Sequence, residues 1–225
     1  MTAPDEPHDH DHEDGHEHAH APHPPARPDT DDELTYYKAM EIAVRELLIE
    51  KGVISADDVR RAIEAMDARS PAQGARIVAR AWTDPAYKAR LLADPNAAIR
   101  ELGIEPGVYK LVVLENTLRV HNLVVCTLCS CYPRAVLGLP PDWYKSRAYR
   151  SRAVREPRAV LREFGTEIPH HVAVHVHDST ADMRYLVLPE RPAGTDGMSE
   201  SALADLVTRD SMIGVAQARS PAKSN

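Results

Sequence analysis

The chain has 225 residues, of which 43% are hydrophobic, and this is enough to bury one sizeable core or two small ones. The sequence has no run of about 18 apolar residues, which excludes a membrane-spanning helix, and its acidic N-terminal stretch has no apolar region of the kind found in secretory signals. Three clustered cysteines do not make the paired framework of a disulfide-rich extracellular protein, so we expect a protein of the reducing cytoplasm.

The charge of the chain is concentrated at the N-terminus. Residues 1–33 hold eleven acidic residues and a single arginine, so this stretch has a net charge of −10 and the remainder a net charge of +3. Seven of the twelve histidines lie in the same stretch: His8, His10, His12, His16, His18, His20 and His23. Because so polar a composition cannot form a packed core, we predict a disordered tail over residues 1–29. The tail is either simply solvated or gathers divalent ions such as cobalt, nickel and zinc on its imidazoles.

Residues 30–104 are predicted to form an arm of short helices. Thr30 and Glu33 have the spacing of a capping box, as do Ser55 and Asp58. Three further helices are expected to begin at a proline that follows a capping residue, because proline loses no hydrogen bond at the first helical position. These starts are Ser70-Pro71, Asp84-Pro85 and Asp94-Pro95. The apolar content of the helices is modest, so we expect the arm to lie against a partner chain.

From residue 105 the pattern changes to strands and helices, and we predict an α+β fold in which a layered α/β domain over residues 105–217 follows the arm. Runs of β-branched or alternating apolar residues predict strands over 110–115, 122–126, 171–177 and 184–188. Helices are predicted over 142–155 and 157–164 and near 199–209, before an apolar segment over 212–215. Residues 218–225 are polar, and we predict a loose C-terminal tail.

All three cysteines lie in one hexapeptide, CTLCSC, at residues 126–131. A structural zinc site needs four ligands, and the fourth would be a distant histidine such as His121 or His175. A redox-active CxxC pair would lack the βαβ context of thioredoxin-like sites. In a third interpretation, the loop binds one metal through its sulfurs and two backbone amides and leaves a sixth position open. These ligands would be the sulfurs of Cys126, Cys129 and Cys131 and the amide nitrogens of Ser130 and Cys131. Deprotonating an amide needs a strongly polarising ion, which favours trivalent cobalt or iron over zinc.

The stretch VCTLCSCYPRAVLGLPPDWYK, residues 125–145, closely resembles the metal-binding segment of nitrile hydratase α subunits. Similar segments follow at residues 149–164, 178–197 and 206–215, and two more lie upstream at 81–94 and 115–117. A CxxCSC motif in this setting is highly specific, and the resemblance covers nearly everything after the tail. It implies the fold of that family, with a helical arm followed by a metal-binding domain.

The resemblance implies a low-spin Co(III) or Fe(III) ion, one per subunit, on the five ligands named above. It also implies that Cys129 is oxidised to a sulfinate and Cys131 to a sulfenate, which are steps on the known oxidation ladder of cysteine. Thr127 matches the cobalt form of the family, in which the motif begins CTLC. The implied reaction adds water to a nitrile and gives the amide, with the metal as a Lewis acid or as an activator of water. Cys131 and Cys129 would be the catalytic groups.

The resemblance also implies partners and supporting residues. Enzymes of the family pair this subunit with a β subunit, as αβ or α2β2, whose arginines bind the oxidised sulfurs, and an activator protein loads the metal. Asp178 and Asp182 match a pair of acidic residues that hold hydrogen bonds of the site, and Arg184 matches the arginine in the same loop. Such supporting residues commonly tune metal affinity and activity.

One departure from the family pattern bears on the substrate. After Cys131 the cobalt enzymes usually read YPWP, whereas here Tyr132-Pro133 is followed by Arg134. Arginine at this place resembles the γ subunit of thiocyanate hydrolase, a cobalt relative that converts thiocyanate to carbonyl sulfide and ammonia, and a cation suits a small anion. We expect Tyr132 and Arg134 in the substrate pocket, with a small-molecule nitrile as the first substrate hypothesis and thiocyanate as the second.

Two other classes of function can be weighed on the sequence. A non-catalytic zinc or metal-storage protein would use the cysteines together with the His-rich tail. A nucleic-acid-binding protein could use a run of basic residues, but no aromatic stacking platform accompanies the run. We interpret these residues as helix faces that pair with a partner subunit: Lys145, Arg147, Arg150, Arg152, Arg155, Arg158 and Arg162.

Overall fold

The computed structural model describes residues 34–221, and within them the chain has the predicted α+β fold. The tail predicted over residues 1–29, the Thr30–Glu33 capping box and residues 222–225 lie outside the described part. The helices are α1 (Tyr36–Glu50), α2 (Ala56–Asp67), α3 (Pro71–Thr83), α4 (Pro85–Ala93), α5 (Pro95–Arg100), α6 (Arg134–Leu137), α7 (Asp142–Lys145), α8 (Arg147–Arg155), α9 (Pro157–Glu163), α10 (Glu200–Ala204) and α11 (Arg209–Ile213). The strands are β1 (Lys110–Glu115), β2 (Val120–Val125), β3 (Ala173–Asp178) and β4 (Met183–Leu188). Among residues 34–221, no helix is both long and apolar enough to cross a membrane.

Helices α1 and α2 begin at capping residues but bury none of their side chains. Thr35 caps α1 through its side-chain oxygen. The predicted capping box at α2 is confirmed, because Ser55 and Asp58 each accept a hydrogen bond from the backbone N–H of the other. Large apolar side chains of both helices are exposed, for example Val44 on α1 and Ile63 on α2. Within the predicted arm, burial therefore begins only after α2.

Helices α3, α4 and α5 begin at the three predicted prolines and contribute to the main core. Asp84 and Asp94 cap α4 and α5 by accepting hydrogen bonds from the backbone N–H of the third residue of each helix. Ile77, Leu91 and Ile99 are completely buried in the same cluster as the side chains of the strands. The last three helices of the predicted arm are thus packed together with the strands.

Two pairs of parallel strands position the cysteine loop, which we define as residues 126–131. β1 pairs with β4, with Lys110 opposite Met183, and β2 pairs with β3, with Val120 opposite Ala173. A short turn closed by a bridge between Thr117 and Val120 reverses the chain between β1 and β2. The C-terminal ends of β2 and β3 therefore lie close to the N-terminal ends of β1 and β4. The cysteine loop follows β2 at this end of the strands.

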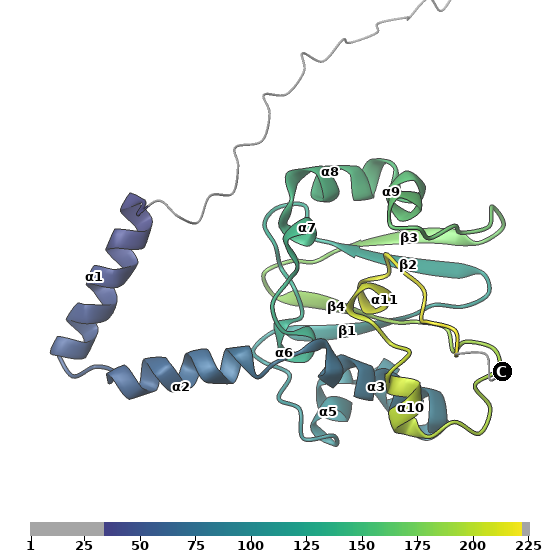
Figure 1. Ribbon diagram of the computed structural model, residues 1–225, viewed down its shortest axis with the longest axis horizontal. Coiled ribbons are helices and arrows are strands. Elements are labelled where there is room, and N and C mark those ends of the chain that lie inside the picture. The colour runs from purple at the N-terminus through teal and green to yellow at the C-terminus, as the bar shows by residue number, and fades with distance from the viewer. Residues whose placement is uncertain (1–33, 222–225) are drawn as a thin grey trace, which may run out of the picture. The chain divides into compact units, whose positions relative to one another are not determined.

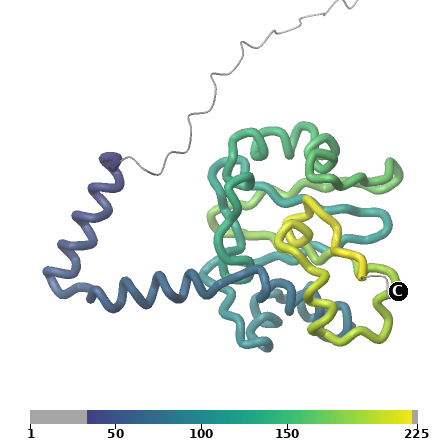
Figure 2. Tube along the Cα trace, in the orientation of Figure 1, coloured from purple at the N-terminus to yellow at the C-terminus, as the bar shows by residue number. Residues whose placement is uncertain are grey.

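Helices cover the strands from more than one direction (Figure 1). α8 and α9 pack along β2 and β3, whereas α4 and α5 contact β1, and α10 packs against α3. The C-terminal segment, yellow in Figure 2, returns to strands formed much earlier in the chain, where α11 contacts β4 and β2. The core that supports the cysteine loop is therefore built from segments distant in sequence.

Several predicted element bounds are corrected by the structure. The helix predicted over 142–155 is two helices, because Ser146 adopts an extended conformation and its hydroxyl caps α8. The helix predicted near 199–209 ends at Ala204, and a separate helix, α11, begins at Arg209 after its cap Thr208 and extends into the segment predicted to be apolar. β3 occupies 173–178 rather than 171–177. β2 begins earlier than predicted, at Val120, because the polar residues His121 and Asn122 are buried within the strand.

A chain of buried polar groups allows β2 to contain these two residues. Nε2 of His121 donates to the carbonyl oxygen of Gly214 (2.7 Å), so Nδ1 is the acceptor for the side-chain amide of Asn116 (3.3 Å). The backbone N–H and side-chain amide of Asn122 both donate to Oδ1 of Asn116, at 2.8 and 3.0 Å. Gly214 has a φ of 88°, and a Cβ atom there would collide with the carbonyl oxygen of Asn122. Only glycine lets the end of α11 approach β2 this closely.

Candidate metal centre

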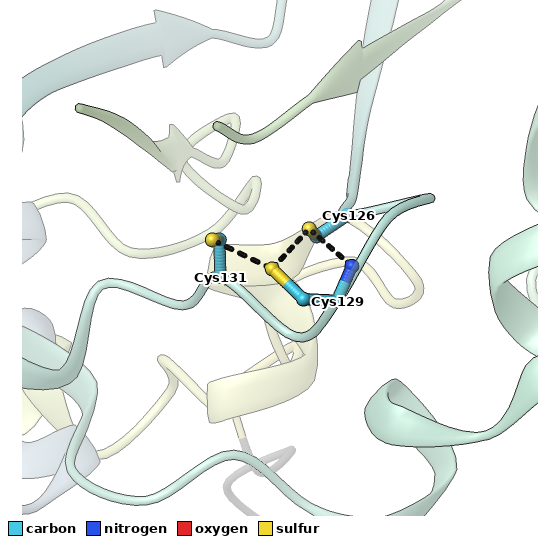
Figure 3. Close-up of side chains that lie close together, drawn as sticks. All are labelled: Cys126, Cys129 and Cys131. Carbon is cyan, nitrogen blue, oxygen red and sulfur yellow. Dashed lines mark hydrogen bonds between the residues drawn. The ribbon is translucent and has the colours of Figure 1, made fainter. Parts of the chain in front are cut away.

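The three cysteine sulfurs of the loop converge on one point (Figure 3). The Sγ atoms of Cys126 and Cys129 are 3.4 Å apart, those of Cys129 and Cys131 are 3.0 Å apart, and all three lie within 4.8 Å of one another. Cys126 is buried at the end of β2, Cys131 is half-buried and Cys129 is exposed. Three soft ligand atoms are thus gathered on one loop, with the middle one open to solvent.

The surroundings of the sulfurs shift the pKa values of Cys129 and Cys131 in opposite directions. Hydrogen bonds from the side chains of Cys131 and Cys126, together with those from the backbone N–H groups of Cys131 and Ser130, lower the pKa of Cys129 to about 7. Burial raises the pKa of Cys131 to about 12, and the neighbouring Cys129 sulfur adds to this effect. Of these two thiols, the exposed Cys129 ionises first, and thiolates are the form that binds metals.

The backbone amides of the loop are also available as ligands. The N–H groups of Ser130 and Cys131 face the sulfur of Cys129, and in the described chain neither forms a backbone–backbone hydrogen bond. By contrast, the N–H of Cys129 donates to the sulfur of Cys126 at 3.3 Å. Three sulfurs and two amide nitrogens that donate to no backbone carbonyl of the described chain fit the donor set that the resemblance implies for a trivalent cobalt or iron ion.

A four-ligand zinc site does not form around these cysteines within residues 34–221. The group of potential metal ligands contains the three cysteines alone. Both ring nitrogens of His121 are engaged with Asn116 and Gly214, and His175 is exposed on β3. Structural zinc normally takes four protein ligands. Neither histidine proposed from the sequence provides the fourth ligand here.

Side chains from two other elements hold the ends of the cysteine loop. The carboxylate of Asp178, at the end of β3, accepts hydrogen bonds from the backbone N–H (2.9 Å) and the hydroxyl (2.5 Å) of Thr127. The hydroxyl of Tyr144 on α7 donates to the carbonyl oxygen of Cys131 at 2.8 Å. Arg150 on α8 contacts the middle of the loop. The loop is therefore tied to the fold at its beginning, middle and end.

An open cavity of about 340 Å³ lies beside the sulfurs of Cys129 and Cys131. Its lining comprises Tyr109, Cys129, Ser130, Cys131, Tyr132, Arg134 and Arg184. The guanidinium of Arg184 lies 5.1 Å from the ring centre of Tyr109, and the hydroxyl of Tyr109 accepts a hydrogen bond from the N–H of Ala135 (2.9 Å). The cavity thus combines two sulfurs with two cationic side chains, which suits a small polar or anionic molecule.

The supporting residues that were predicted from the sequence differ in what they contact in the structure. Asp178 contacts the loop and Arg184 lines the cavity. Asp182 is exposed, and across residues 34–221 its carboxylate makes no hydrogen bond or ion pair; only its backbone carbonyl is used, by the N–H of Lys110. Tyr132 is 2% exposed and Arg134 is exposed, and both line the cavity.

Sequence reasoning missed Tyr109, Tyr144 and Arg150. The basic stretch also needs a correction, because several of its arginines are paired within this chain. Arg152 forms ion pairs with carboxylates of its own and the next helix, and Arg158 donates to backbone carbonyls between residues 168 and 172. Arg150 binds carbonyls of the cysteine loop. A signal was present for Arg150, because it lies in one of the segments that resemble the family.

The comparison with known families decides what kind of protein carries this site. The model of the family "Nitrile hydratase, alpha chain" matches residues 35–216. The chain belongs to the nitrile hydratase alpha-chain family. The resemblance drawn from the CTLCSC motif and its surroundings is therefore confirmed.

Relatives in this family include cobalt proteins. The chain is 54% identical over 184 residues to the low-molecular-weight cobalt-containing nitrile hydratase subunit alpha of Rhodococcus rhodochrous, an alignment that covers 80% of this chain and 88% of that one. It is 52% identical over 181 residues to the cobalt-containing nitrile hydratase subunit alpha of Pseudonocardia thermophila, covering 79% and 88%. It is also 45% identical over 197 residues to the thiocyanate hydrolase subunit gamma of Thiobacillus thioparus, covering 82% and 81%.

Solved structures of the nitrile hydratase family have the same fold. A recombinant thiocyanate hydrolase with partially modified cobalt centres matches with a TM-score of 0.77 at 45% identity, over 83% of this chain and 92% of that one. A double mutant of the Fe-type nitrile hydratase of Comamonas testosteroni Ni1 also matches with a TM-score of 0.77, at 42% identity over 85% and 94%. The family thus includes cobalt and iron proteins and two named activities.

Proposed function

We propose that this chain is the catalytic α subunit of a nitrile hydratase that holds Co(III) in its cysteine loop and converts a nitrile and water to the amide. The observation that carries the proposal is the convergence of three sulfurs within 4.8 Å, beside an open cavity and two amides that donate to no backbone carbonyl of residues 34–221. The names of the relatives with the highest identities quoted above, both cobalt-containing nitrile hydratases, support the choice of reaction and metal.

In this proposal, five ligands from the cysteine loop hold the metal: the sulfurs of Cys126, Cys129 and Cys131 and the amide nitrogens of Ser130 and Cys131. When bound, the ion supplies Lewis-acid polarisation of the substrate or of water. Cys129 is the sulfinate and Cys131 the sulfenate. Cys131 lines the cavity, and in this proposal its sulfenate oxygen would act on the substrate as a nucleophile or on water as a base.

The chain's own residues supply the remaining features of the proposed site. Tyr132 and Arg134 form the substrate pocket, and Asp178 and Arg184 support the cysteine loop and the cavity wall. Asp182 stays a proposed supporting residue, although its carboxylate is exposed. The cavity is open and Leu128, at the tip of the loop, is 89% exposed, which fits a site that a β subunit completes in an αβ or α2β2 assembly. We further propose that an activator protein loads the metal and that the enzyme is cytoplasmic.

Thiocyanate hydrolysis is the second candidate, and the two arginines of the cavity favour it. Arg134 and Arg184 both line the space beside the sulfurs, and a cationic wall stabilises a small anion such as thiocyanate. The relationship to the thiocyanate hydrolase subunit gamma supports the same substrate.

One experiment separates the two candidates. The chain is co-produced with its neighbouring subunit in cobalt medium, and hydration of a neutral nitrile is compared with turnover of thiocyanate, for the wild type and for Arg134→Trp. A nitrile hydratase turns over the nitrile before and after the substitution. A thiocyanate hydrolase prefers thiocyanate and loses that preference in Arg134→Trp. If the wild type ignores thiocyanate, Arg134 does not select an anion.

A further inference from the structure

The middle of the cysteine loop is held from outside by a single arginine. Nη1 of Arg150 donates hydrogen bonds to the carbonyl oxygens of Leu128 (3.1 Å) and Cys129 (2.9 Å). The Nε atom of Arg150 is buried and has no hydrogen-bond partner in the described chain, so part of the guanidinium is removed from water. Hydrogen bonds from a charged donor such as this guanidinium are stronger than those between neutral groups.

The helix that carries Arg150 is itself fixed to the strand that leads into the loop. Ser146 caps the first turn of α8. The adjacent Tyr149 is buried, and its hydroxyl donates to the carbonyl oxygen of Val124 in β2 at 2.6 Å. Val124 lies only two residues before Cys126. The same contact between β2 and α8 therefore positions both the guanidinium of Arg150 and the cysteine loop.

The two carbonyl contacts determine which way the neighbouring amides face. In a planar trans peptide, the C=O and the following N–H point in opposite directions. Because the carbonyl of Cys129 faces Arg150, the N–H of Ser130 in the same peptide faces away from it, toward the sulfur of Cys129. In the same way, the N–H of Cys129 faces the sulfur of Cys126. Arg150 thus lies on the outer side of the peptides whose inner side faces the sulfurs.

We propose that Arg150 is a positioning residue that presets the cysteine loop for a metal bound through backbone nitrogen, by holding the carbonyls of Leu128 and Cys129 outward so that the Ser130 nitrogen faces the three sulfurs. This inference rests on the proposed function, because it concerns the same ligand set. It assigns a role to a residue of the basic stretch that contacts neither the sulfurs nor the cavity directly. Without this arginine the sulfurs can still gather, but the peptide between Cys129 and Ser130 is free to turn.

The test compares a metal that needs the amides with one that needs only thiolates. Cd²⁺ is a soft ion that binds thiolates and leaves peptide nitrogens protonated, whereas the proposed cobalt site uses both donor types. Full-length wild type, Arg150→Gln and Arg150→Lys are produced with the neighbouring subunit in cobalt medium, and cobalt per chain and the absorption spectrum are measured. The same chains, produced without cobalt so that their three cysteines stay reduced, are titrated with Cd²⁺. Arg155→Gln is the matched control, since Arg155 lies on the same helix and donates to Ser151 of that helix.

We expect Arg150→Gln to retain cobalt roughly 10- to 100-fold less well than the wild type, as for other residues that orient metal ligands. Its affinity for Cd²⁺ should remain within about threefold, and Arg155→Gln should match the wild type for both ions. Arg150→Lys should recover part of the cobalt, because an ammonium keeps the charge but lacks the planar guanidinium.

Two results overturn the assignment of Arg150 and leave the proposed function intact: wild-type cobalt content and spectrum in Arg150→Gln, or an equal loss of Cd²⁺ and cobalt, which would mark a purely structural role. A wild-type chain that takes up no cobalt under these conditions overturns the proposed function, and the assignment of Arg150 with it.

Discussion

Asp178 holds Thr127 at two points, through the backbone N–H and through the side-chain hydroxyl, and so fixes the first turn of the cysteine loop to the end of β3. An asparagine in this place keeps the shape but has only one acceptor oxygen, and its NH₂ group cannot accept the second hydrogen bond. We predict that Asp178→Asn lowers the free energy of unfolding by about 1–3 kcal/mol and metal affinity by roughly 10- to 100-fold. Chemical denaturation and metal analysis measure the two effects.

Asp182→Asn is the matched control for this prediction. Asp182 is the other member of the acidic pair, but its carboxylate is exposed and makes no hydrogen bond or ion pair with residues 34–221. Its substitution should change the free energy of unfolding by less than about 0.5 kcal/mol. Equal losses in both variants would show that the bonds to Thr127 are not what makes Asp178 important.

Two tyrosines with similar hydrogen bonds should have different effects on the metal. Tyr144 donates to the carbonyl of Cys131 in the loop, whereas Tyr149 donates to the carbonyl of Val124 in β2. We predict that Tyr144→Phe and Tyr149→Phe each lower the free energy of unfolding by about 1 kcal/mol, the usual net value of one hydrogen bond. Tyr144→Phe should reduce the cobalt content more than Tyr149→Phe does, because Tyr144 bonds directly to a ligand residue whereas Tyr149 acts only through β2 and α8. Unchanged cobalt in Tyr144→Phe would argue against this tie.

The close approach of α11 to β2 should make Gly214 intolerant of any side chain. Gly214→Ala adds a Cβ atom that collides with the carbonyl of Asn122, in a backbone with a φ of 88°. Gly197 has a similar φ of 77°, but nothing lies within 4 Å of an added Cβ. Gly197→Ala should therefore lose only the conformational term of about 1–2 kcal/mol, and Gly214→Ala clearly more. Thermal unfolding of both variants decides this, and equal losses would contradict the packing described.

Stability should fall as the pH is lowered, because a buried histidine resists protonation. Burial lowers the pKa of His121 below its ordinary value of 6.5, and the nearby Arg158 adds to this. The unfolded chain therefore binds the proton first as the pH falls below about 6.5. The contribution is complete above that pH and decreases below it, by up to about 1.4 kcal/mol per pH unit and proton. His177, whose pKa is also lowered by burial, acts in the same direction.

The pH prediction is checked by urea unfolding of the metal-free chain between about pH 7.5 and pH 5.5. In His121→Gln the free energy of unfolding should depend less steeply on pH, whatever its absolute value. A wild type whose stability is flat over this interval would show that His121 is not held neutral by the fold.

The signals that predicted structure correctly from the sequence were local ones. The prolines that open α3, α4 and α5 and the capping box of Ser55 and Asp58 depend on a few neighbouring residues, and the structure contains all of them. The start of β2 was missed because the burial of His121 depends on Gly214, which is 93 residues away. No local pattern indicates that a histidine has such a partner.

For the candidate site as well, some residues were indicated by the sequence and others were not. The CTLCSC motif identified the cysteines, and the resemblance to the family identified Asp178 and Arg184. Arg150 and Tyr144 were missed because each donates hydrogen bonds only to backbone carbonyls of the loop. Every residue has a backbone carbonyl, so the sequence does not show which of them is bound. The arginines of the basic stretch were assigned to a partner because sequence alone does not show that carboxylates and carbonyls of this chain surround them.

The most direct test of the proposed enzyme is the intact mass and metal content of the chain, co-produced with its neighbouring subunit in cobalt-supplemented medium. The account predicts about one cobalt per chain and about three added oxygen atoms on Cys129 and Cys131 together, as a sulfinate and a sulfenate require. Zinc bound to unmodified thiols, despite the presence of cobalt and the partner subunit, would contradict it.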